Sequence, residues 1–434
     1  MTLTNEELRE LLHERSPSEL LRIAERVKRV GGCERPIRLK ATGMGSPSHD
    51  EADGVLLIAC KSRRETRCAP CAATYRGDAR WLVRAGIEGG KGVPETVSSH
   101  PAVLVTLTAP SFGAVHRTGG ICHVGQPGRC PHGRPSYCLS RHGEQEEILG
   151  SPICTDCYDY EGAVLFNATA GELWRRVTIY ARRHLAYLLG RPEREVKEEV
   201  RLSYLKVAEL QRRGVVHLHA IVRADAAAVD VLGPPDQVTT ELLSQALIRA
   251  VASVYRDVTV GNRTRRLVFG EQVKVDRLPA GEVKGVASYL AKYLSKEASG
   301  TGSLDHRLRE GEIELLELPG HLRRIVETAW RLGGEPYLGR VRRWAHALGY
   351  TGHLMTKSRR YSTTFTALRE ARQAWRRDTE DPGNGTESRP IWEFAGMGYR
   401  RQIDSCMAQA YRDDVCTSRT EGWKAWREEL RCVA

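Results

Sequence analysis

The run Val215-Val-His-Leu-His-Ala-Ile-Val222 constrains the fold more than any other segment of this 434-residue chain. Side chains alternate between the two faces of a strand, so His217 and His219 share one face and the opposite face is wholly apolar. Burying two imidazoles without partners costs free energy, which makes them unusual inside an apolar strand. The pattern therefore predicts either a divalent-metal site or one hydrogen-bonded core histidine beside one surface histidine.

A third candidate ligand precedes the histidines. Arg201–Glu209 and Val215–Arg223 are β-like and flank a turn-forming segment, so they predict a hairpin. If its loop has five residues, Glu209 faces Val215 and shares the face of the two histidines. Two imidazoles and one carboxylate, with open positions, suit Mg²⁺ or Mn²⁺ acting on phosphate oxygens. The alternative for Glu209 is an ion pair with Arg212 or Arg213.

The segment Val286–Lys296 predicts a helix with a reactive face. At 3.6 residues per turn, tyrosine and lysine side chains alternate along one stripe, formed by Tyr289, Lys292, Tyr293 and Lys296. Leu290 and Leu294 lie on a neighbouring face and can pack inward. A nearby ammonium favours the phenolate, so this spacing suits attack on a phosphodiester. The alternative is an amphipathic helix with its tyrosines at the rim of the core.

The twelve cysteines indicate metal binding. The polar, acidic N-terminus is not a secretory signal, and clustered thiols in a reducing cytoplasm bind metal more often than they form disulfides. Two Cys₄ zinc sites are expected, one from Cys33, Cys60, Cys68 and Cys71 and one from Cys130, Cys138, Cys154 and Cys157. A single zinc site formed by the two Cys-x-x-Cys pairs is the alternative, and His132 could replace a cysteine in the second set. Cys122, Cys406, Cys416 and Cys432 receive no role.

The charge of the chain is concentrated in one region. Lys+Arg exceed Asp+Glu by 66 − 54 = +12, and His321–Arg377 alone carries 13 basic against 3 acidic residues, or +10. Arginines neutralise backbone phosphates, while interleaved aromatic residues stack on exposed bases. We expect DNA contacts from the densest points, which are Arg342, Arg343, Lys357, Arg359 and Arg360. The alternative is a solvated arginine-rich helical face with its tryptophans in the core.

Three separated segments follow one another along the chain in an order that can be compared with known motifs. They are Val103-Leu-Val-Thr-Leu-Thr-Ala-Pro110, His217-Leu-His219 and Tyr289-Leu-Ala-Lys-Tyr-Leu-Ser-Lys296. This order resembles the three motifs of rolling-circle initiators of the HUH endonuclease superfamily, in its two-tyrosine branch. Other stretches resemble the RepSA-type plasmid replication initiators of actinobacteria, among them Gly54–Cys71, Cys130-Pro-His-Gly-Arg-Pro135, Cys154–Tyr160 and Lys357–Ser362.

The resemblance implies an α+β HUH nuclease fold: a central antiparallel sheet with flanking helices, zinc-binding elements and a mostly helical C-terminal domain. It implies a metal-dependent endonuclease and strand transferase that nicks one origin strand through Tyr289 or Tyr293. The tyrosine becomes linked to the 5′ phosphate, and the free 3′ hydroxyl primes synthesis. His217 and His219 would be metal ligands, and Lys292 and Lys296 would assist. Origin DNA, a host helicase and a polymerase would be the partners.

Three domains are expected: a zinc-binding element in 1–95, the endonuclease in 96–300 with a cysteine-rich insert at about 120–160, and a basic DNA-binding region in 301–434. No phosphate-binding loop and no apolar run of membrane-spanning length occurs, which argues against a helicase motor and a membrane protein and favours a cytoplasmic location. A conjugative relaxase or transposase is one alternative, although relaxases usually place tyrosine before the histidines. A non-catalytic zinc-containing DNA-binding regulator is the other.

Overall fold

The computed structural model describes residues 15–42, 55–124, 128–228, 231, 233–278, 286–287, 290, 306–379 and 391–413. The chain forms two compact units of α+β character. One unit contains residues up to Ala79 together with those from Phe365 onward, and the other contains Arg80–Thr364. Within the described residues, no helix has the length and apolar composition that a membrane span requires.

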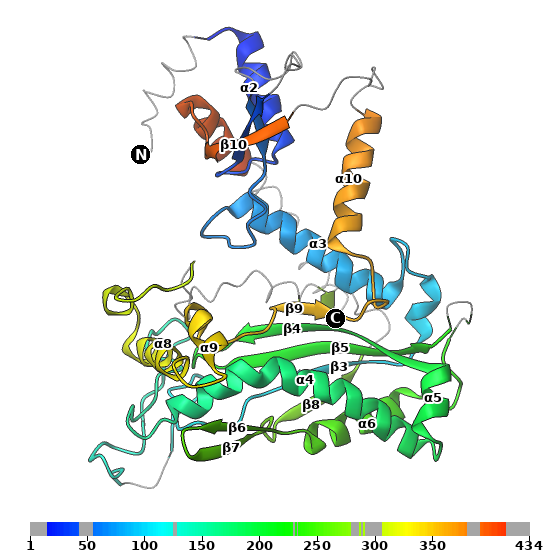
Figure 1. Ribbon diagram of the computed structural model, residues 1–434, viewed down its shortest axis with the longest axis vertical. Helices are drawn as coiled ribbons and strands as arrows, with labels where there is room; N and C mark the ends of the chain where they lie inside the picture. Colours follow the sequence, from blue (N-terminus) through cyan, green and yellow to red (C-terminus); the bar gives the residue numbers. More distant parts are fainter. Residues whose placement is uncertain are drawn as a thin grey trace. The chain divides into compact units, whose positions relative to one another are not determined.

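The larger unit is built on a five-stranded sheet in the order β8-β3-β5-β4-β9 (Figure 1). Every neighbouring pair is antiparallel. Its strands are β3 (Ala102–Leu107), β4 (Val200–Leu210), β5 (Val216–Ala226), β8 (Val273–Arg277) and β9 (Met355–Lys357). The histidine run therefore occupies β5, the central strand.

One face of this sheet is covered by helices. The helices α4 (Tyr160–Leu188) and α6 (Thr240–Ser253) lie across it (Figure 1), and α8 (Gly320–Leu332) packs against α4. The apolar side chains of β5 on that face, Leu218, Ala220 and Val222, are buried in the same core as these helices. This burial fixes the opposite face of β5 as the one that carries the histidines. The unit also contains α5 (Glu193–Glu199), α9 (Gly339–Arg343) and the hairpin β6 (Arg256–Val260) with β7 (Arg263–Leu267).

The turn between β4 and β5 is tighter than the sequence suggested. Glu209 pairs with His217 in the register, not with Val215, because Gln211 and Val215 close the turn themselves. Gly214 supplies the positive φ of +73° that the turn needs. The shift is two residues, so Glu209 keeps the face that parity predicted.

The buried side chain of Asn167 on α4 holds this turn in place. Its amide nitrogen donates to the carbonyls of Gly214 and Leu348, at 2.9 and 2.8 Å, and its oxygen accepts from the N–H of Val216 at 2.8 Å. The Gly214 carbonyl and the Val216 N–H of the turn are thus paired, and the same side chain ties the turn to the Leu348 carbonyl.

A buried polar network lies at the far end of the histidine-bearing face. Arg223, 1% exposed, donates to Asp225 at 2.5 and 3.0 Å and to the carbonyl of Gly86 on α3 (Ala69–Glu88). Its guanidinium also lies over the ring of Tyr361. Any side chain at Gly86 would collide with that ring, since a Cβ there would stand 2.1 Å from it. Arg223 and Tyr361 are therefore buried away from solvent. His217 and His219 lie on the same face, nearer the turn between β4 and β5.

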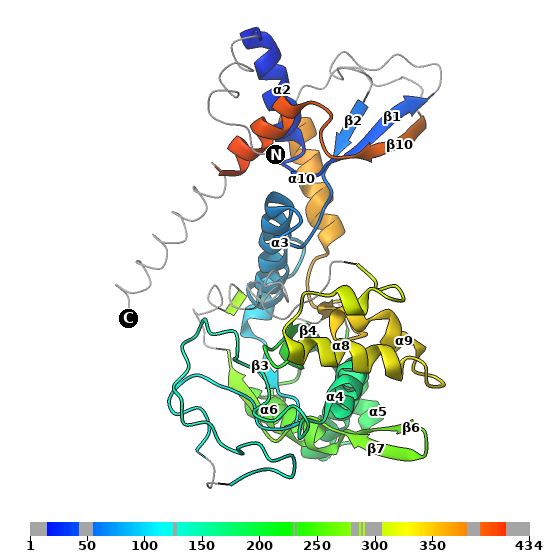
Figure 2. The same ribbon diagram turned by 90° about the vertical axis from the view of Figure 1, so that its left-hand side faces the viewer.

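The smaller unit has a sheet of its own, with strands in the order β10-β1-β2 (Figure 2). It consists of β1 (Ile37–Thr42), β2 (Val55–Ile58) and β10 (Ile391–Met397), accompanied by α2 (Pro17–Arg29) and α10 (Phe365–Thr379). Arg26 pairs with the buried Asp404 at 2.5 Å, and Arg372 on α10 donates to Asp78 on α3. Ion pairs between residues far apart in sequence thus join the two chain segments of this unit.

The C-terminal region differs from the expected helical domain. The strand β9 joins the sheet of the larger unit, and β10 joins that of the smaller unit. Of the described residues from 306 onward, those up to Thr364 group with the larger unit and those from Phe365 with the smaller. The sequence boundaries at 95 and 300 do not coincide with this division either.

Candidate catalytic site and metal-binding clusters

The two histidines of β5 lie side by side on the sheet face that is not covered by α4 and α6. Their ring centroids are 4.6 Å apart, and His219 is 2% exposed. The Nδ1 of His219 lies 3.2 Å from Oγ1 of Thr106, its register partner on β3. A hydrogen bond at Nδ1 fixes the ring orientation and leaves Nε2 as the atom that can bind a metal.

Glu209 lies beside them, as the hairpin predicted. Its Oε2 is 3.7 Å from Nε2 of His219. Burial, followed by the neighbouring His219, lowers the pKa of His217 to about 4, so this imidazole is neutral at neutral pH, the form that binds metal. The Nδ1 of His217 is buried and has no hydrogen-bond partner among the described residues. An orphaned buried nitrogen beside an imidazole and a carboxylate fits a divalent ion.

Arg212 and Arg213, the alternative ion-pair partners of Glu209, bind backbone carbonyls instead. Arg213 donates to the carbonyls of Ala109 and Pro110, both at 3.2 Å, and Arg212 donates to the carbonyl of Glu146 at 3.2 Å. Both guanidinium groups thus tie the turn to other loops. Among the described residues, however, the donor atoms of Glu209, His217 and His219 do not approach one another as closely as those of the three clusters below.

The proposed nucleophiles fall outside the described residues. This applies to Tyr289, Tyr293, Lys292 and Lys296, and also to Leu294. Ala287 and Leu290 are described, and they are 3% and 0% exposed. The inward packing expected for Leu290 is therefore confirmed.

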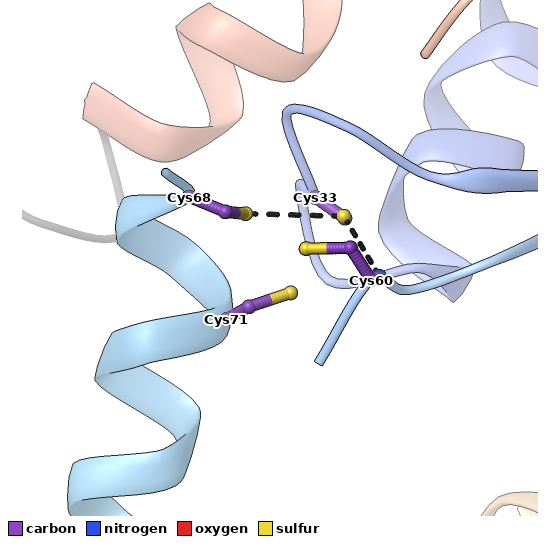
Figure 3. A group of neighbouring side chains, drawn as sticks. All are labelled: Cys33, Cys60, Cys68 and Cys71. Atoms are coloured by element: carbon purple, nitrogen blue, oxygen red, sulfur yellow. Dashed lines mark hydrogen bonds between the residues drawn. The ribbon is translucent and has the colours of Figure 1, made fainter. Parts of the chain in front are cut away.

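Cys33, Cys60, Cys68 and Cys71 form one cluster in the smaller unit (Figure 3), grouped as the sequence predicted. Cys71 lies on the first turn of α3, with Cys68 just before it and the other two on loops. The sulfurs of Cys68 and Cys33 are 3.8 Å apart, and backbone N–H groups donate to the sulfurs of Cys33 and Cys68 at 3.2 and 3.4 Å. Hydrogen bonds within the cluster lower the pKa values of Cys60 and Cys68 and raise those of Cys33 and Cys71, so the four thiols titrate as one coupled group.

The second predicted set is corrected by the structure. Cys130, Cys154 and Cys157 do meet, and their fourth partner is His132, the replacement that the sequence analysis allowed, and not Cys138. The sulfurs of Cys130 and Cys154 are 3.6 Å apart, and His132 Nδ1 lies 3.3 Å from Cys157. The alternative of one site built from both Cys-x-x-Cys pairs is wrong, because the pairs lie in separate clusters.

A third cluster escaped the sequence analysis. Cys138 lies with His116, Cys122 and His142. It was missed because Cys122 and Cys138 belong to no Cys-x-x-Cys pair. The usable signal was a histidine six residues before Cys122 and another four residues after Cys138.

The basic residues of the C-terminal region differ in their surroundings. Arg343 and Arg359 are exposed, whereas Arg342 stacks on the ring of Trp330 at 4.1 Å. Lys357 donates to the carbonyls of Ser358, Arg359 and Ser362, and Arg360 donates to that of Ala227. Of the interleaved aromatic residues, Tyr350 and Tyr361 are 2% and 0% exposed, so they pack inside the protein and do not face bases.

A family model and a related protein both identify the chain as similar to replication initiator proteins. Residues 19–413 match the family RepSA, described as "Replication initiator protein, pSAM2". A replication initiator protein of Streptomyces ambofaciens is 37% identical over 455 residues, an alignment that covers 98% of this chain and 96% of that protein. No solved structure matches the chain.

Proposed function

Since the chain belongs to the RepSA family of replication initiator proteins, we propose that it starts rolling-circle replication by nicking one strand of its origin DNA. The observation that carries the proposal is the placement of His217, His219 and Glu209 on one face of the sheet, with both histidines on its central strand. A rigid strand held by neighbours on both sides keeps these donors in fixed relative positions.

The three donors on this face would hold a catalytic Mg²⁺ or Mn²⁺. When bound, such an ion polarises a phosphate oxygen and makes the phosphorus more electrophilic. Thr106 holds the ring of His219 in position, and the buried His217 remains neutral. The sheet face therefore binds and orients the scissile phosphate.

The chemistry itself falls to the tyrosine helix. Tyr289 or Tyr293 attacks the phosphorus, and the bond from phosphorus to the 3′ oxygen breaks. The phosphate stays on the tyrosine, while the departing oxygen takes a proton and becomes the 3′ hydroxyl that primes synthesis. Lys292 and Lys296 stabilise the phenolate and contact phosphate oxygens. At termination a 3′ hydroxyl attacks the phosphotyrosine and rejoins the strand.

The sulfur-rich clusters would be structural zinc sites. Four thiolates in the first cluster, and three thiolates with one imidazole in the second, are donor sets that zinc prefers. The donor separations of 3.3 to 3.8 Å fit the edge of a zinc tetrahedron, which is about 3.3–3.8 Å for the usual bond lengths. Exposed arginines, led by Arg343 and Arg359, would contact the phosphates of the flanking duplex.

The test is covalent adduct formation. Purified protein with Mg²⁺ or Mn²⁺ and single-stranded origin DNA is expected to form a denaturation-resistant complex, in which mass spectrometry locates the modified tyrosine. His219→Ala, and the double change Tyr289→Phe with Tyr293→Phe, abolish it. The exposed His353→Ala and Tyr337→Phe are the matched controls and retain it.

The three Cys/His clusters also suit a zinc-containing DNA-binding regulator without catalysis. That alternative predicts specific DNA binding with no adduct under any metal condition, so the same experiment separates the two functions.

A further inference from the structure

The described part of the segment between β3 and α4 has little regular secondary structure and few buried apolar side chains. Between Leu107 and Tyr160, its described residues form only isolated bridges, with no helix or strand. Several of its large apolar side chains face solvent, namely Ile121, Val124, Leu139 and Ile148. A stretch of this length with so little core needs another source of order.

The third cluster offers four well-placed donors in this segment. The Nδ1 of His116 lies 3.1 Å from Nε2 of His142 and 3.5 Å from the sulfur of Cys122. The sulfur of Cys138 lies 3.4 Å from Nε2 of His142. All four donor atoms lie within 4.8 Å of one another. These separations are close to the tetrahedral edge of about 3.3–3.8 Å expected around zinc.

The surroundings of the donors are also organised as in a metal site. His123 and Cys138 exchange both backbone hydrogen bonds in an isolated bridge, which places the chain beside Cys122 next to Cys138. The N–H of Arg117 donates to the sulfur of Cys122 at 3.4 Å. The carboxylate of Glu146 binds Nδ1 of His142 at 2.7 Å, which leaves Nε2 free to coordinate.

We propose that His116, Cys122, Cys138 and His142 bind a third zinc ion, in a Cys₂His₂ site. The donor set contains two thiolates and two imidazoles, a combination that favours zinc and completes a closed structural site. The argument for this site does not rest on the nicking activity proposed above.

The order of the ligands along the chain indicates that the third site braces the same segment as the second. The pairs alternate: His116 and Cys122 serve the third site, Cys130 and His132 the second, Cys138 and His142 the third, and Cys154 and Cys157 the second. Each ion therefore closes a loop that contains a ligand pair of the other, so the two ions cross-brace one module. We call the described residues of this stretch, 116–124 and 128–157, the cross-braced module.

The module is connected to the catalytic hairpin. Arg212 on the β4–β5 turn donates to the carbonyl of Glu146, the residue that orients His142. Gly150 lies against the backbone of Arg212 and Arg213, where a Cβ would come within 2.5 Å. Metal binding in the module thus supports the turn that joins the strands of Glu209 and His217.

Metal content of the full-length protein tests the proposal. Native mass spectrometry of protein purified with zinc is expected to show three ions per chain, and Cys138→Ser is expected to show two or fewer. Cys406→Ser, a cysteine outside all three clusters, is the matched control and keeps three. Two ions or fewer in the wild type, or three in Cys138→Ser, overturns the proposal.

A second measurement, the absorbance of the cobalt-substituted protein, uses a variant that exchanges one metal ligand for another and so keeps four donors at the site. In the cobalt-substituted wild type, nine thiolates bind metal if all three sites are filled, since the clusters hold four, three and two cysteines. His142→Cys keeps a tetrahedral donor set and adds a tenth, so the thiolate-to-cobalt charge-transfer absorbance rises by about one ninth relative to wild type at unchanged metal content. An unchanged absorbance places no metal at His142 and overturns the proposal.

Discussion

Glu209 and His217 face each other across β4 and β5, and they are the second-last pair before the turn of the hairpin. The next histidine, His219, faces Val207 on one side and Thr106 on the other. A carboxylate and two imidazoles thus lie together near the turn that joins β4 and β5, in the middle of one end of the sheet. This arrangement links the proposed catalytic metal to specific hydrogen-bond partners that can be changed one at a time.

Replacing the carboxylate should weaken metal binding without unfolding the sheet. Glu209→Gln keeps the size of the side chain but loses its charge, so nicking should need a higher Mn²⁺ concentration and should recover in part when Mn²⁺ is raised. The readout is the metal concentration for half-maximal adduct formation. The exposed Glu327→Gln on α8 is the control. An unchanged metal requirement would show that Glu209 is not a ligand.

Removing the partner of His219 tests the orientation of its ring. Thr106→Val deletes the hydroxyl next to Nδ1 while keeping a β-branched side chain in β3. Loss of such a supporting hydrogen bond typically costs about 10- to 100-fold in metal affinity or activity. Thr259→Val, in the exposed β6–β7 hairpin, removes a comparable hydroxyl far from the site. Equal activity of the two variants would exclude this role for Thr106.

The buried Lys206 predicts a pH dependence of stability. It lies on the helix-covered face of β4, donates to Tyr350 Oη and to the carbonyl of His353, and burial lowers its pKa from 10.5 to about 8. Between these values the unfolded chain binds more protons, so the free energy of unfolding contributed by Lys206 rises with pH and is lowest below pH 8.

Lys206→Met should therefore stabilise the protein near pH 7, by at most about 3 kcal/mol from a pKa shift of this size. The gain should shrink as the pH passes from 8 to 10.5, where the wild-type lysine loses its charge. Urea unfolding at several pH values measures the difference. Lys274→Met, whose side chain is 74% exposed, serves as control and should show no such trend.

The salt dependence of DNA binding should separate the basic residues. Arg343 and Arg359 are exposed, while Lys357 is held by three carbonyls of its own loop. Each phosphate contact contributes about 0.9 to the slope of log K against log salt. Arg343→Ala and Arg359→Ala should each lower that slope by about one, and Lys357→Ala should leave it nearly unchanged. Equal slopes for all three variants would contradict the assignment.

The cross-braced module should lose its ions together. Cys157→Ser removes a ligand of the second cluster, but it also releases the loop that holds Cys138 and His142. Since a cross-link around a loop of about 15 residues contributes about 3 kcal/mol, zinc affinity at the third cluster should fall by about tenfold or more. Cys71→Ser, in the other unit, should leave that affinity unchanged. Competition with a chromophoric chelator measures both variants.

Local patterns predicted the hairpin well. Alternation in Val215–Val222 and the turn residues before it were sufficient to find β4, β5 and the shared face of Glu209 and the histidines. Parity alone carried this inference, so it survived a two-residue error in the turn. The tyrosine helix remains a prediction, because its reactive residues lie outside the described ranges.

Non-local pairing explains what the sequence did not reveal. The three residues of β9 are too few to produce a pattern, and they become a strand only because β4 offers them an edge. The placement of Cys138 with His116, Cys122 and His142 has the same origin, although the sequence did offer His132 as a ligand of the second cluster. Spacing identifies which residues can bind metal, but the path of an irregular loop decides which of them meet.

The smaller unit combines the two ends of the described chain: β1 and β2 come from its first part, and their neighbour β10 comes from its last. A ribosome delivers the chain from the N-terminus, so β1 has no partner in β10 until the whole of the larger unit, Arg80–Thr364, has been synthesised. The larger unit is formed by one continuous segment, so it can fold before β10 is available to pair with β1. During synthesis, the exposed edge of β1 is therefore a point at which a nascent chain is vulnerable to mispairing with another copy.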